Sequence, residues 1–353
     1  MNLVLNNCLM ILPGRKSAVG DIVVTNGKID KILISSEERA SSPRGIDLSG
    51  AIVMPGIVDA HCHAPMTLLR GVGGGLPLKR WLEEAIFPVE ARMTDEDVAA
   101  GMTWGAMELL AGGVTCVADM YEHSLAGAAA LAETGIKANV CRPGLAFSDG
   151  TPKGRLEECI DFVRNFRDSN GRLLADICIH SEYLTDEKFC RALAEANREF
   201  TRPLNVHVSE TKREHEECIA RHGKTPIAYL AETGLLDYGG YAAHCVWCTD
   251  DDFKIMADRN VSLVHNPSSN MKLASGFARV CRAAELGVNV ALGTDGPASN
   301  DNLDMFEEMH LTSLIHKGVL LDPTVLSPWE VIEMATVNGA KALGRYDTGE
   351  IAV

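Results

Sequence analysis

The stretch IVMPGIVDAHCH, residues 52–63, marks the point where the sequence changes its pattern. Before it, short apolar runs alternate with turns, and the dipeptide Asn26-Gly27 is a signal of a tight β-hairpin. After it, apolar β-rich runs alternate with segments of helical periodicity. Such alternation is typical of β/α units that build a parallel sheet. Residues 1–54 are therefore predicted to belong to a small β-domain, and the following residues to an α/β domain.

Eight apolar β-rich runs follow this pattern, which predicts a closed (β/α)8 barrel, or TIM barrel, over residues 55–345. The runs are residues 56–63, 113–120, 137–145, 174–183, 203–210, 240–247, 261–270 and 288–296. One intervening helix begins with a Thr94/Asp97 capping pattern. Another has Pro226 in its first turn and Gly234 just past its end. The alternative is an open doubly wound sheet, but no GxGxxG follows the first run, which weighs against a nucleotide-binding sheet.

Length and charge limit the class of function. The chain has 353 residues, enough for a barrel of about 250 residues with an accessory domain. It carries 33 Lys+Arg against 48 Asp+Glu, with no basic run, which weighs against nucleic acids and anionic membranes as partners. The start shows no signal-peptide pattern, and no apolar run approaches the roughly 18 residues of a membrane span. Eleven cysteines scattered through apolar segments fit reduced, buried thiols, so a cytoplasmic protein is expected.

The His-Cys-His triplet at residues 61–63 raises the question of a metal site. In a strand, residues two apart face the same side, so His61 and His63 are expected to point together. Cys62 is expected to face the other way, as a packing residue. A His-x-His pair taken alone is weak evidence for a metal.

Later strand ends strengthen the metal hypothesis. They carry further chemical side chains, namely His180, His207, Glu210, His244 and Asp295. The carboxyl ends of barrel strands are where active sites lie in this architecture. Three neutral imidazoles and one carboxylate suit Zn²⁺ with an open position for water, and the same ligand types accommodate Fe²⁺. The fourth run ends in CIHSEY without a lysine that could bridge two metals, so one ion per chain is expected.

Two short motifs suggest a different metal chemistry. HSE at 180–182 and CVWC at 245–248 match parts of the signature of the small cytidine-type zinc deaminases. The C-x-x-C lacks its preceding proline, and its two cysteines project differently from a strand end. A thioredoxin-like use of these cysteines has still less support. The set that includes His207 and Asp295 explains more residues and is preferred.

Five segments together carry a family resemblance: MPGIVDAHCHAPMTLLRG, HVSET, AAHCVW, HNPSSNMKLASG and LGTDGPASNDNLDMFEEM. They resemble the amidohydrolase superfamily and, more narrowly, its group of S-adenosylhomocysteine, 5′-methylthioadenosine and 5′-deoxyadenosine deaminases. The resemblance covers essentially the whole chain. It implies a TIM barrel with a small β-sandwich domain formed by the two termini. It also implies hydrolysis of a 5′-substituted adenosine to the inosine analogue and ammonia.

The resemblance also implies roles for individual residues. The implied metal ligands are His61, His63, His207 and Asp295. Glu210 would contact the substrate ring and transfer a proton to it. His244 and Asp295 would accept the proton of the attacking water and orient that water.

Three further residues are implied to bind the nucleoside. WLEEAIFPVE matches a loop of the adenosine-type group whose glutamate, here Glu90, holds the ribose hydroxyls. Arg142 in CRPG and His180 would reach the 5′ substituent and the purine. The implied partner is a small nucleoside, and assembly into a homo-oligomer is left open.

The sequence departs from the group in two places. Arg279 stands where the group usually has a proline, close to the pocket. The chain ends at TGEIAV, whereas family members continue for several dozen residues that complete the small β-domain. Residues 346–353 are therefore expected to begin that last segment, and the strands at 3–12 and 19–34 to lack their partners.

Three other functions remain open. Guanine or other aminoheterocycle deaminases and triazine chlorohydrolases share much of this skeleton. The loop with Glu90 favours a substrate that bears ribose, since a free base or a triazine offers no hydroxyl pair. An inactive scaffold is the non-enzymatic alternative, but every implied ligand is present.

Overall fold

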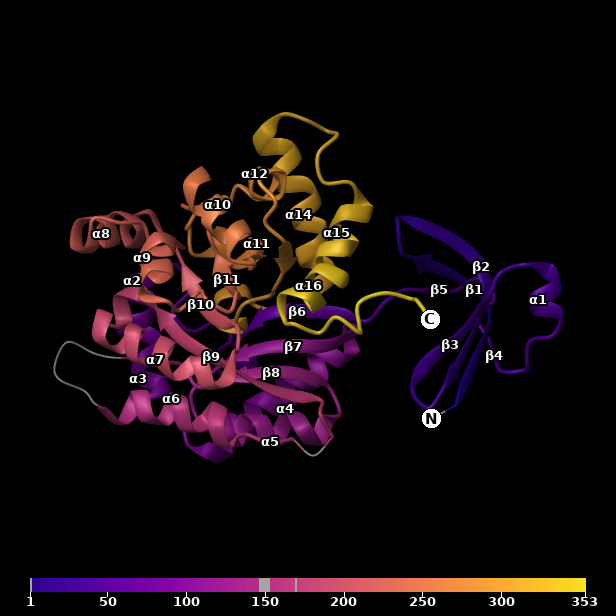
Figure 1. Ribbon diagram of the computed structural model, residues 1–353, viewed down its shortest axis with the longest axis horizontal. Coiled ribbons are helices and arrows are strands. Elements are labelled where there is room, and N and C mark those ends of the chain that lie inside the picture. The colour runs from indigo at the N-terminus through magenta and orange to yellow at the C-terminus, as the bar shows by residue number, and fades with distance from the viewer. Residues whose placement is uncertain (1, 146–152, 169) are drawn as a thin grey trace. The chain divides into compact units, whose positions relative to one another are not determined.

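The structure is a computed structural model that describes residues 2–145, 153–168 and 170–353 (Figure 1). The chain divides into two compact units. The smaller unit consists of Met1–Gly56 and Tyr346–Val353, and the larger one of Ile57–Arg345.

The smaller unit is a five-stranded sheet with one short helix, α1 (Ser36–Ala40). Its strands are β1 (Leu3–Leu12), β2 (Lys16–Thr25), β3 (Lys28–Leu33), β4 (Ile46–Asp47) and β5 (Ile52–Val53). Segments 3–12 and 19–34, which we expected to lack partners, pair with each other, because β2 lies antiparallel between β1 and β3. Asn26 and Gly27 join β2 to β3 with φ of 54° and 81°, which confirms the predicted hairpin turn. Ile351 packs on the core of this sheet.

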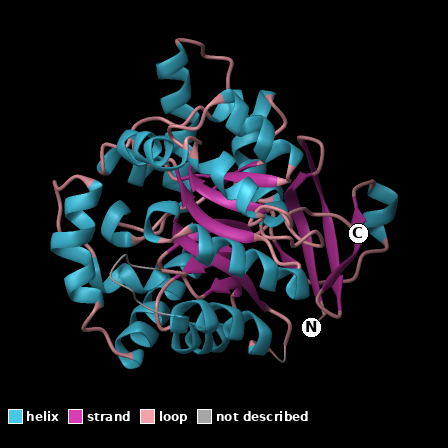
Figure 2. Cartoon of the chain, turned by 60° about the vertical axis from the view of Figure 1, so that its left-hand side comes forward, coloured by secondary structure: helices cyan, strands magenta, loops and turns pink. Residues whose placement is uncertain are grey.

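The larger unit contains a parallel sheet of eight strands in sequence order. They are β6 (Ile57–Cys62), β7 (Val114–Met120), β8 (Lys137–Cys141), β9 (Leu173–Ser181), β10 (Leu204–Val208), β11 (Gly240–His244), β12 (Val261–His265) and β13 (Val290–Leu292). The sheet closes between its first and last strands, where the Asp295 N–H donates to the His61 carbonyl at 2.9 Å. Helices surround the strands (Figure 2). Each predicted run overlaps one strand, so the (β/α)8 prediction is confirmed.

The helices of the larger unit follow their strands along the chain. They are η1 (Ala64–Leu69), α2 (Leu78–Arg80), the π-helix η2 (Trp81–Ile86), α3 (Phe87–Glu90), α4 (Asp95–Ala111), α5 (Ser124–Thr134), α6 (Lys153–Asn165), η3 (Glu182–Leu184), α7 (Glu187–Phe200), α8 (Lys212–His222), α9 (Pro226–Thr233), α10 (Asp250–Asp258), α11 (Pro267–Lys272), α12 (Val280–Glu285), α13 (Pro297–Asn300), α14 (Met305–Leu320), α15 (Pro328–Met334) and α16 (Val337–Ala342). The predicted starts of α4 at Thr94 and of α9 at Pro226 are confirmed. Across the described ranges, no helix has both the length and the apolarity to cross a membrane.

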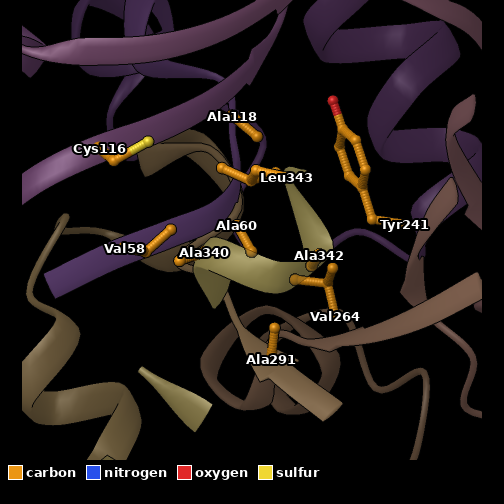
Figure 3. Close-up of a cluster of buried hydrophobic side chains, with 10 residues drawn as sticks. All are labelled: Val58, Ala60, Cys116, Ala118, Tyr241, Val264, Ala291, Ala340, Ala342 and Leu343. Atoms are coloured by element: carbon orange, nitrogen blue, oxygen red, sulfur yellow. The ribbon is translucent and has the colours of Figure 1, made fainter. Parts of the chain in front are cut away.

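A cluster of buried, mostly small and medium apolar side chains with one tyrosine, Tyr241, packs α16 against the barrel (Figure 3). It includes Ala60 of β6, Ala118 of β7 and Ala340 of α16. Gly339 has no room for a side chain, because a Cβ there would lie 2.9 Å from the Cβ of Val58. The helix and the first barrel strand therefore pack in close contact at this point.

Candidate metal centre and active site

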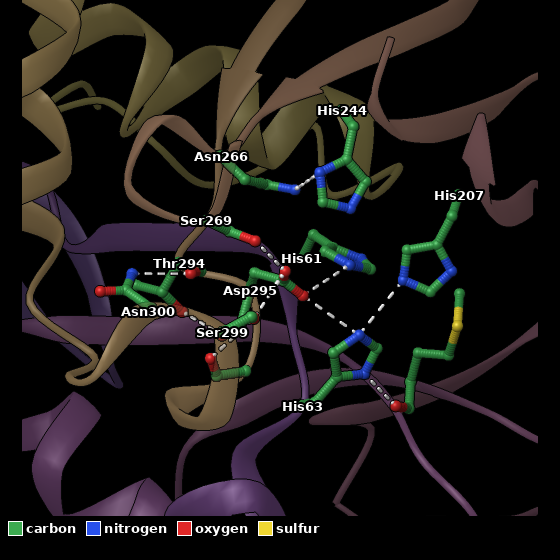
Figure 4. Close-up of polar contacts among 12 residues, drawn as sticks. His61, His63, His207, His244, Asn266, Ser269, Thr294, Asp295, Ser299 and Asn300 are labelled. Carbon is green, nitrogen blue, oxygen red and sulfur yellow. Dashed lines mark hydrogen bonds and ion pairs between the residues drawn. The ribbon is translucent and has the colours of Figure 1, made fainter. Parts of the chain in front are cut away.

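Four histidines and one aspartate converge at the carboxyl ends of the barrel strands (Figure 4). They are His61, His63, His207, His244 and Asp295, and all are buried. One ligand atom from each of His61, His207, His244 and Asp295 lies within 4.8 Å of the others. The Nε2 of His63 joins the group, 3.2 Å from both the Nε2 of His207 and the Oδ1 of Asp295. The structure thus brings all four predicted metal ligands together, with His244 beside them.

Hydrogen bonds to backbone carbonyls fix the tautomers of two of these rings. The Nδ1 of His63 contacts the carbonyl of Met120, and the Nδ1 of His207 lies 2.7 Å from the carbonyl of His180. Because a carbonyl only accepts, both Nδ1 atoms carry a proton, and in the neutral rings both Nε2 atoms present lone pairs. Two lone pairs 3.2 Å apart repel each other unless a cation lies between them. The ring orientations therefore fit a bound metal.

The remaining contacts of the cluster support the same conclusion. Neither ring nitrogen of His61 makes a hydrogen bond within the described part of the chain, although the ring is fully buried. Its Nε2 lies 3.4 Å from the Oδ1 of Asp295. Ligands about 2.0–2.1 Å from a tetrahedral Zn²⁺ are separated by roughly 3.4 Å, close to the spacings found here. These residues could hold one such ion.

Asp295 provides the negative charge of the centre. Its Oδ2 accepts hydrogen bonds from the hydroxyls of Ser269 at 2.6 Å and Ser299 at 2.9 Å, which leaves Oδ1 to face the histidines. Burial alone would raise the pKa of Asp295, but its contacts with His61 and His63 hold that pKa well below its usual range. The carboxylate is therefore ionised at neutral pH.

The electrostatics of the rings match metal binding. Burial lowers the pKa of His61 to about 4 and that of His207 well below its ordinary value, so both rings are neutral at pH 7. Burial also lowers the pKa of His63, but Asp295 outweighs it and raises that pKa to about 9. Asp295 thus favours a positive charge at His63, which a proton or a metal ion can supply. A metal ion that binds His63 displaces the proton.

Backbone strain accompanies this cluster. His244 and Asp295 have positive φ values of 72° and 62°, and Ser209, beside Glu210, has 47°. Side chains other than glycine rarely adopt such φ values, and strained residues of this kind persist where surrounding contacts enforce them, often at functional sites. All three positions follow or end barrel strands, so the strain coincides with the turns that aim the polar side chains.

Glu210 and His244 form the second half of the site. The Nδ1 of His244 donates to the Oδ1 of Asn270 at 2.8 Å, so its Nε2 carries a lone pair and lies 3.8 Å from the Oε2 of Glu210. The Oε1 of Glu210 accepts from the hydroxyl of Ser275 at 3.3 Å. Burial raises the pKa of Glu210, so its carboxyl holds a proton to higher pH than an exposed glutamate does.

A cavity of about 480 Å³ adjoins the metal centre and is large enough for a small organic ligand. Apolar side chains such as Trp81 and Leu273 form much of its wall. Glu90, at the end of α3, and His180, at the end of β9, also line it, as does Glu210. Three of the predicted substrate-binding residues thus line one cavity with three of the predicted metal ligands, His63, His207 and Asp295.

Arg142 is placed differently. It is not among the residues that line the cavity, and its guanidinium lies between the carboxylates of Glu122 and Glu158. Arg155 of α6 lines the cavity instead and bonds Glu122 at 2.8 Å. We predicted neither Glu122 nor Arg155. Glu122 follows a barrel strand, so the reasoning that found Asp295 could have found it, whereas Arg155 carries no such signal.

The alternative zinc motif does not assemble at this site. Cys245 and Cys248 are buried and are not among the described residues that line the cavity. Glu182 is buried and pairs with Arg221. Cys62 is likewise buried and outside the lining, as a packing residue would be.

Comparison with known proteins gives consistent matches. Residues 52–353 match the amidohydrolase family. The chain is 44% identical over 335 residues to a 5-methylthioadenosine/S-adenosylhomocysteine deaminase of Acetivibrio thermocellus, covering 93% of this chain and 77% of that protein. It is 42% identical over 328 residues to a 5′-deoxyadenosine deaminase of Methanosarcina mazei, covering 92% of this chain and 75% of the other.

A solved structure agrees with these sequence matches. It is an adenosine deaminase from Xanthomonas campestris with bound zinc, superimposed with a TM-score of 0.93 at 33% identity. The superposition covers 100% of this chain and 82% of the other. With its barrel, its cluster of histidines and aspartate, and a family match over most of its length, the chain belongs to the amidohydrolase family.

Proposed function

We propose that this protein is a zinc-dependent deaminase that hydrolyses 5′-substituted adenosines to the inosine analogues and ammonia. The observation that carries the proposal is the meeting of one metal-ligand cluster, the Glu210/His244 pair and Glu90 at a single cavity. Relatives at 44% and 42% identity are named for 5-methylthioadenosine, S-adenosylhomocysteine and 5′-deoxyadenosine, which supports this substrate class.

The proposed reaction replaces the 6-amino group of adenine with oxygen from water. When bound, zinc supplies Lewis acidity that makes water a nucleophile at neutral pH. Asp295 and the Nε2 of His244 orient the water and accept its proton as its oxygen bonds to C6. Glu210, whose raised pKa favours the protonated form, gives its proton to N1, so the ring nitrogen does not carry a full negative charge. The proton held by Asp295 and His244 then passes to the amino nitrogen, the bond from C6 to that nitrogen breaks, and ammonia leaves. The remaining hydroxyl proton at C6 passes to Glu210 as the carbonyl forms, which restores the starting state.

The cavity wall gives the remaining residues their proposed roles. Glu90 is proposed to accept hydrogen bonds from the two ribose hydroxyls, a role supported by its presence in the cavity wall. His180, beside the ring of His207, contacts the purine. Arg142 keeps its proposed role at the 5′ end of the nucleoside, although Arg155 and not Arg142 lines the cavity.

The first test measures product release by the purified, zinc-loaded protein from a panel of compounds, as ammonia from the amino compounds and as chloride from the triazine. The panel contains S-adenosylhomocysteine, methylthioadenosine, 5′-deoxyadenosine, adenosine, AMP, guanine and a chlorotriazine. We expect turnover of the 5′-modified adenosines and little turnover of AMP, because nothing proposed here binds a phosphate. Activity on guanine or the triazine alone would contradict the proposal, and bound metal without any turnover would favour the scaffold alternative.

A further inference from the structure

The turn that carries Glu210 is strained. Ser209, which precedes it, has a φ of 47°, in the left-handed region that serine rarely adopts. The turn connects the end of β10 to the start of α8. A turn of this kind keeps its shape only where neighbouring groups hold it. The direction of the Glu210 side chain therefore depends on what binds the backbone N–H groups of this turn.

Glu214, in the first turn of α8, binds these groups. Its Oε1 accepts from the Ser209 N–H at 2.8 Å, and its Oε2 accepts from the Glu210 N–H at 2.7 Å. In a capping box the glutamate at this position accepts a hydrogen bond from the backbone N–H of the N-cap residue. Here the N-cap residue is Thr211, and its nitrogen lies 3.5 Å from the Oε2 of Glu214, farther than the nitrogens of Ser209 and Glu210 lie from their acceptors. The carboxyl group of Glu214 thus reaches past the helix cap to the two residues before it.

Other contacts to the turn involve different groups. The Ser209 carbonyl accepts from the Trp247 N–H at 3.0 Å, and the Ser209 hydroxyl lies 3.0 Å from the Nδ1 of His215. Neither contact uses the N–H groups of Ser209 and Glu210. Glu214 is buried and does not line the cavity, so it acts on the turn and not on a bound substrate. Burial raises the pKa of Glu214 to about 8, and the two N–H bonds oppose that shift by favouring the ionised form.

We propose that Glu214 is a positioning residue, which holds the strained Ser209–Glu210 turn and so aims Glu210 at the substrate ring. The inference rests on the proposed function, since it assigns Glu214 a role only through Glu210. A misplacement of about 1 Å in a reacting group costs up to about 100-fold in rate. Removal of one acceptor at Glu214 is therefore expected to lower kcat without a matching change in KM.

The test compares Glu214→Gln in two backgrounds, the unaltered chain and Glu210→Gln. The amide keeps one acceptor and turns a donor toward the other backbone N–H. In the unaltered chain we expect kcat to fall roughly 10- to 100-fold and KM to stay within about twofold. In the Glu210→Gln background we expect the second substitution to change kcat by less than about twofold, because the group it positions is already inactive.

Glu216→Gln is the matched control, because Glu216 lies exposed on the same helix. Among the ion pairs of the described residues, Glu216 takes part in one, with Lys212 at 3.5 Å. The substitution should leave kcat unchanged. If Glu214→Gln does not fold, Glu214→Asp replaces it, because the aspartate keeps the carboxyl group but is one methylene too short to reach both N–H groups. An equal loss of kcat in both backgrounds overturns the positioning role and leaves the proposed function standing. Full activity of Glu210→Gln alone overturns both the proposed role of Glu210 and the inference.

Discussion

Glu210 is the side chain whose removal separates metal binding from proton transfer. It contacts Ser275 and His244 but is not one of the four predicted ligands, so Glu210→Gln should keep one zinc per chain. The amide cannot donate an acidic proton to the ring, so we expect kcat to fall about 10²- to 10⁴-fold. Zinc content by elemental analysis and steady-state kinetics check both parts. Near-normal turnover would remove Glu210 from this role.

The sequence could predict the positions of some residues of the site but not of others. His61, His63 and Asp295 were predictable, because a period of two and a strand end fix where their side chains point. The same reasoning could not show whether Arg142 or Arg155 lines the cavity. Which of them reaches the cavity depends on how α6 packs beside Glu122, a contact between residues 33 positions apart. No local pattern encodes that choice.

At the scale of elements, the packing of α16 on the barrel can be tested by a substitution that changes protein stability and leaves the active site unchanged. In Gly339→Ala the new Cβ would lie 2.9 Å from the Cβ of Val58, so the helix must move away. We expect a loss of about 1–3 kcal/mol in the free energy of unfolding, with activity per folded molecule unchanged. Denaturant unfolding measures the loss.

Gly318→Ala in α14 is the matched control. A Cβ there meets nothing within 4 Å, so the substitution should stabilise the protein by about 0.5–1 kcal/mol through the helix propensity of alanine. Equal effects of the two substitutions would show that the close packing at Gly339 is unimportant.

The helices and strands show the same contrast: features set by local sequence patterns were predictable, and features set by long-range packing were not. Each of the eight runs overlapped a strand, because the alternation of strands and helices is a local pattern. The run at 261–270 extended too far, since β12 ends at His265 and α11 begins at Pro267, a residue that favours a first helical turn. The π-helix η2 in the predicted Glu90 loop has no simple sequence signal, because its extra residue per turn reflects packing.

For the molecule as a whole, the metal centre joins parts of the barrel that are distant in sequence. His61 and His63 belong to the first strand and its end, His207 to the fifth, and Asp295 follows the eighth. The sheet closes at the same place, through the bond from the Asp295 N–H to the His61 carbonyl. A bound ion therefore connects the two strands whose pairing closes the barrel, so metal binding and barrel stability are coupled.

This coupling predicts a metal-dependent melting temperature. A ligand that binds only the folded state stabilises it by about 2.7 kcal/mol at 100 times its Kd. We expect removal of the metal by a chelator to lower Tm by several degrees, and added Zn²⁺ to restore it, as measured by calorimetry. His207→Ala is the control, because without that ligand the same addition should shift Tm far less. A Tm that is independent of zinc in the unaltered protein would mean that the barrel closes fully without the ion, and the histidine cluster would then need another explanation.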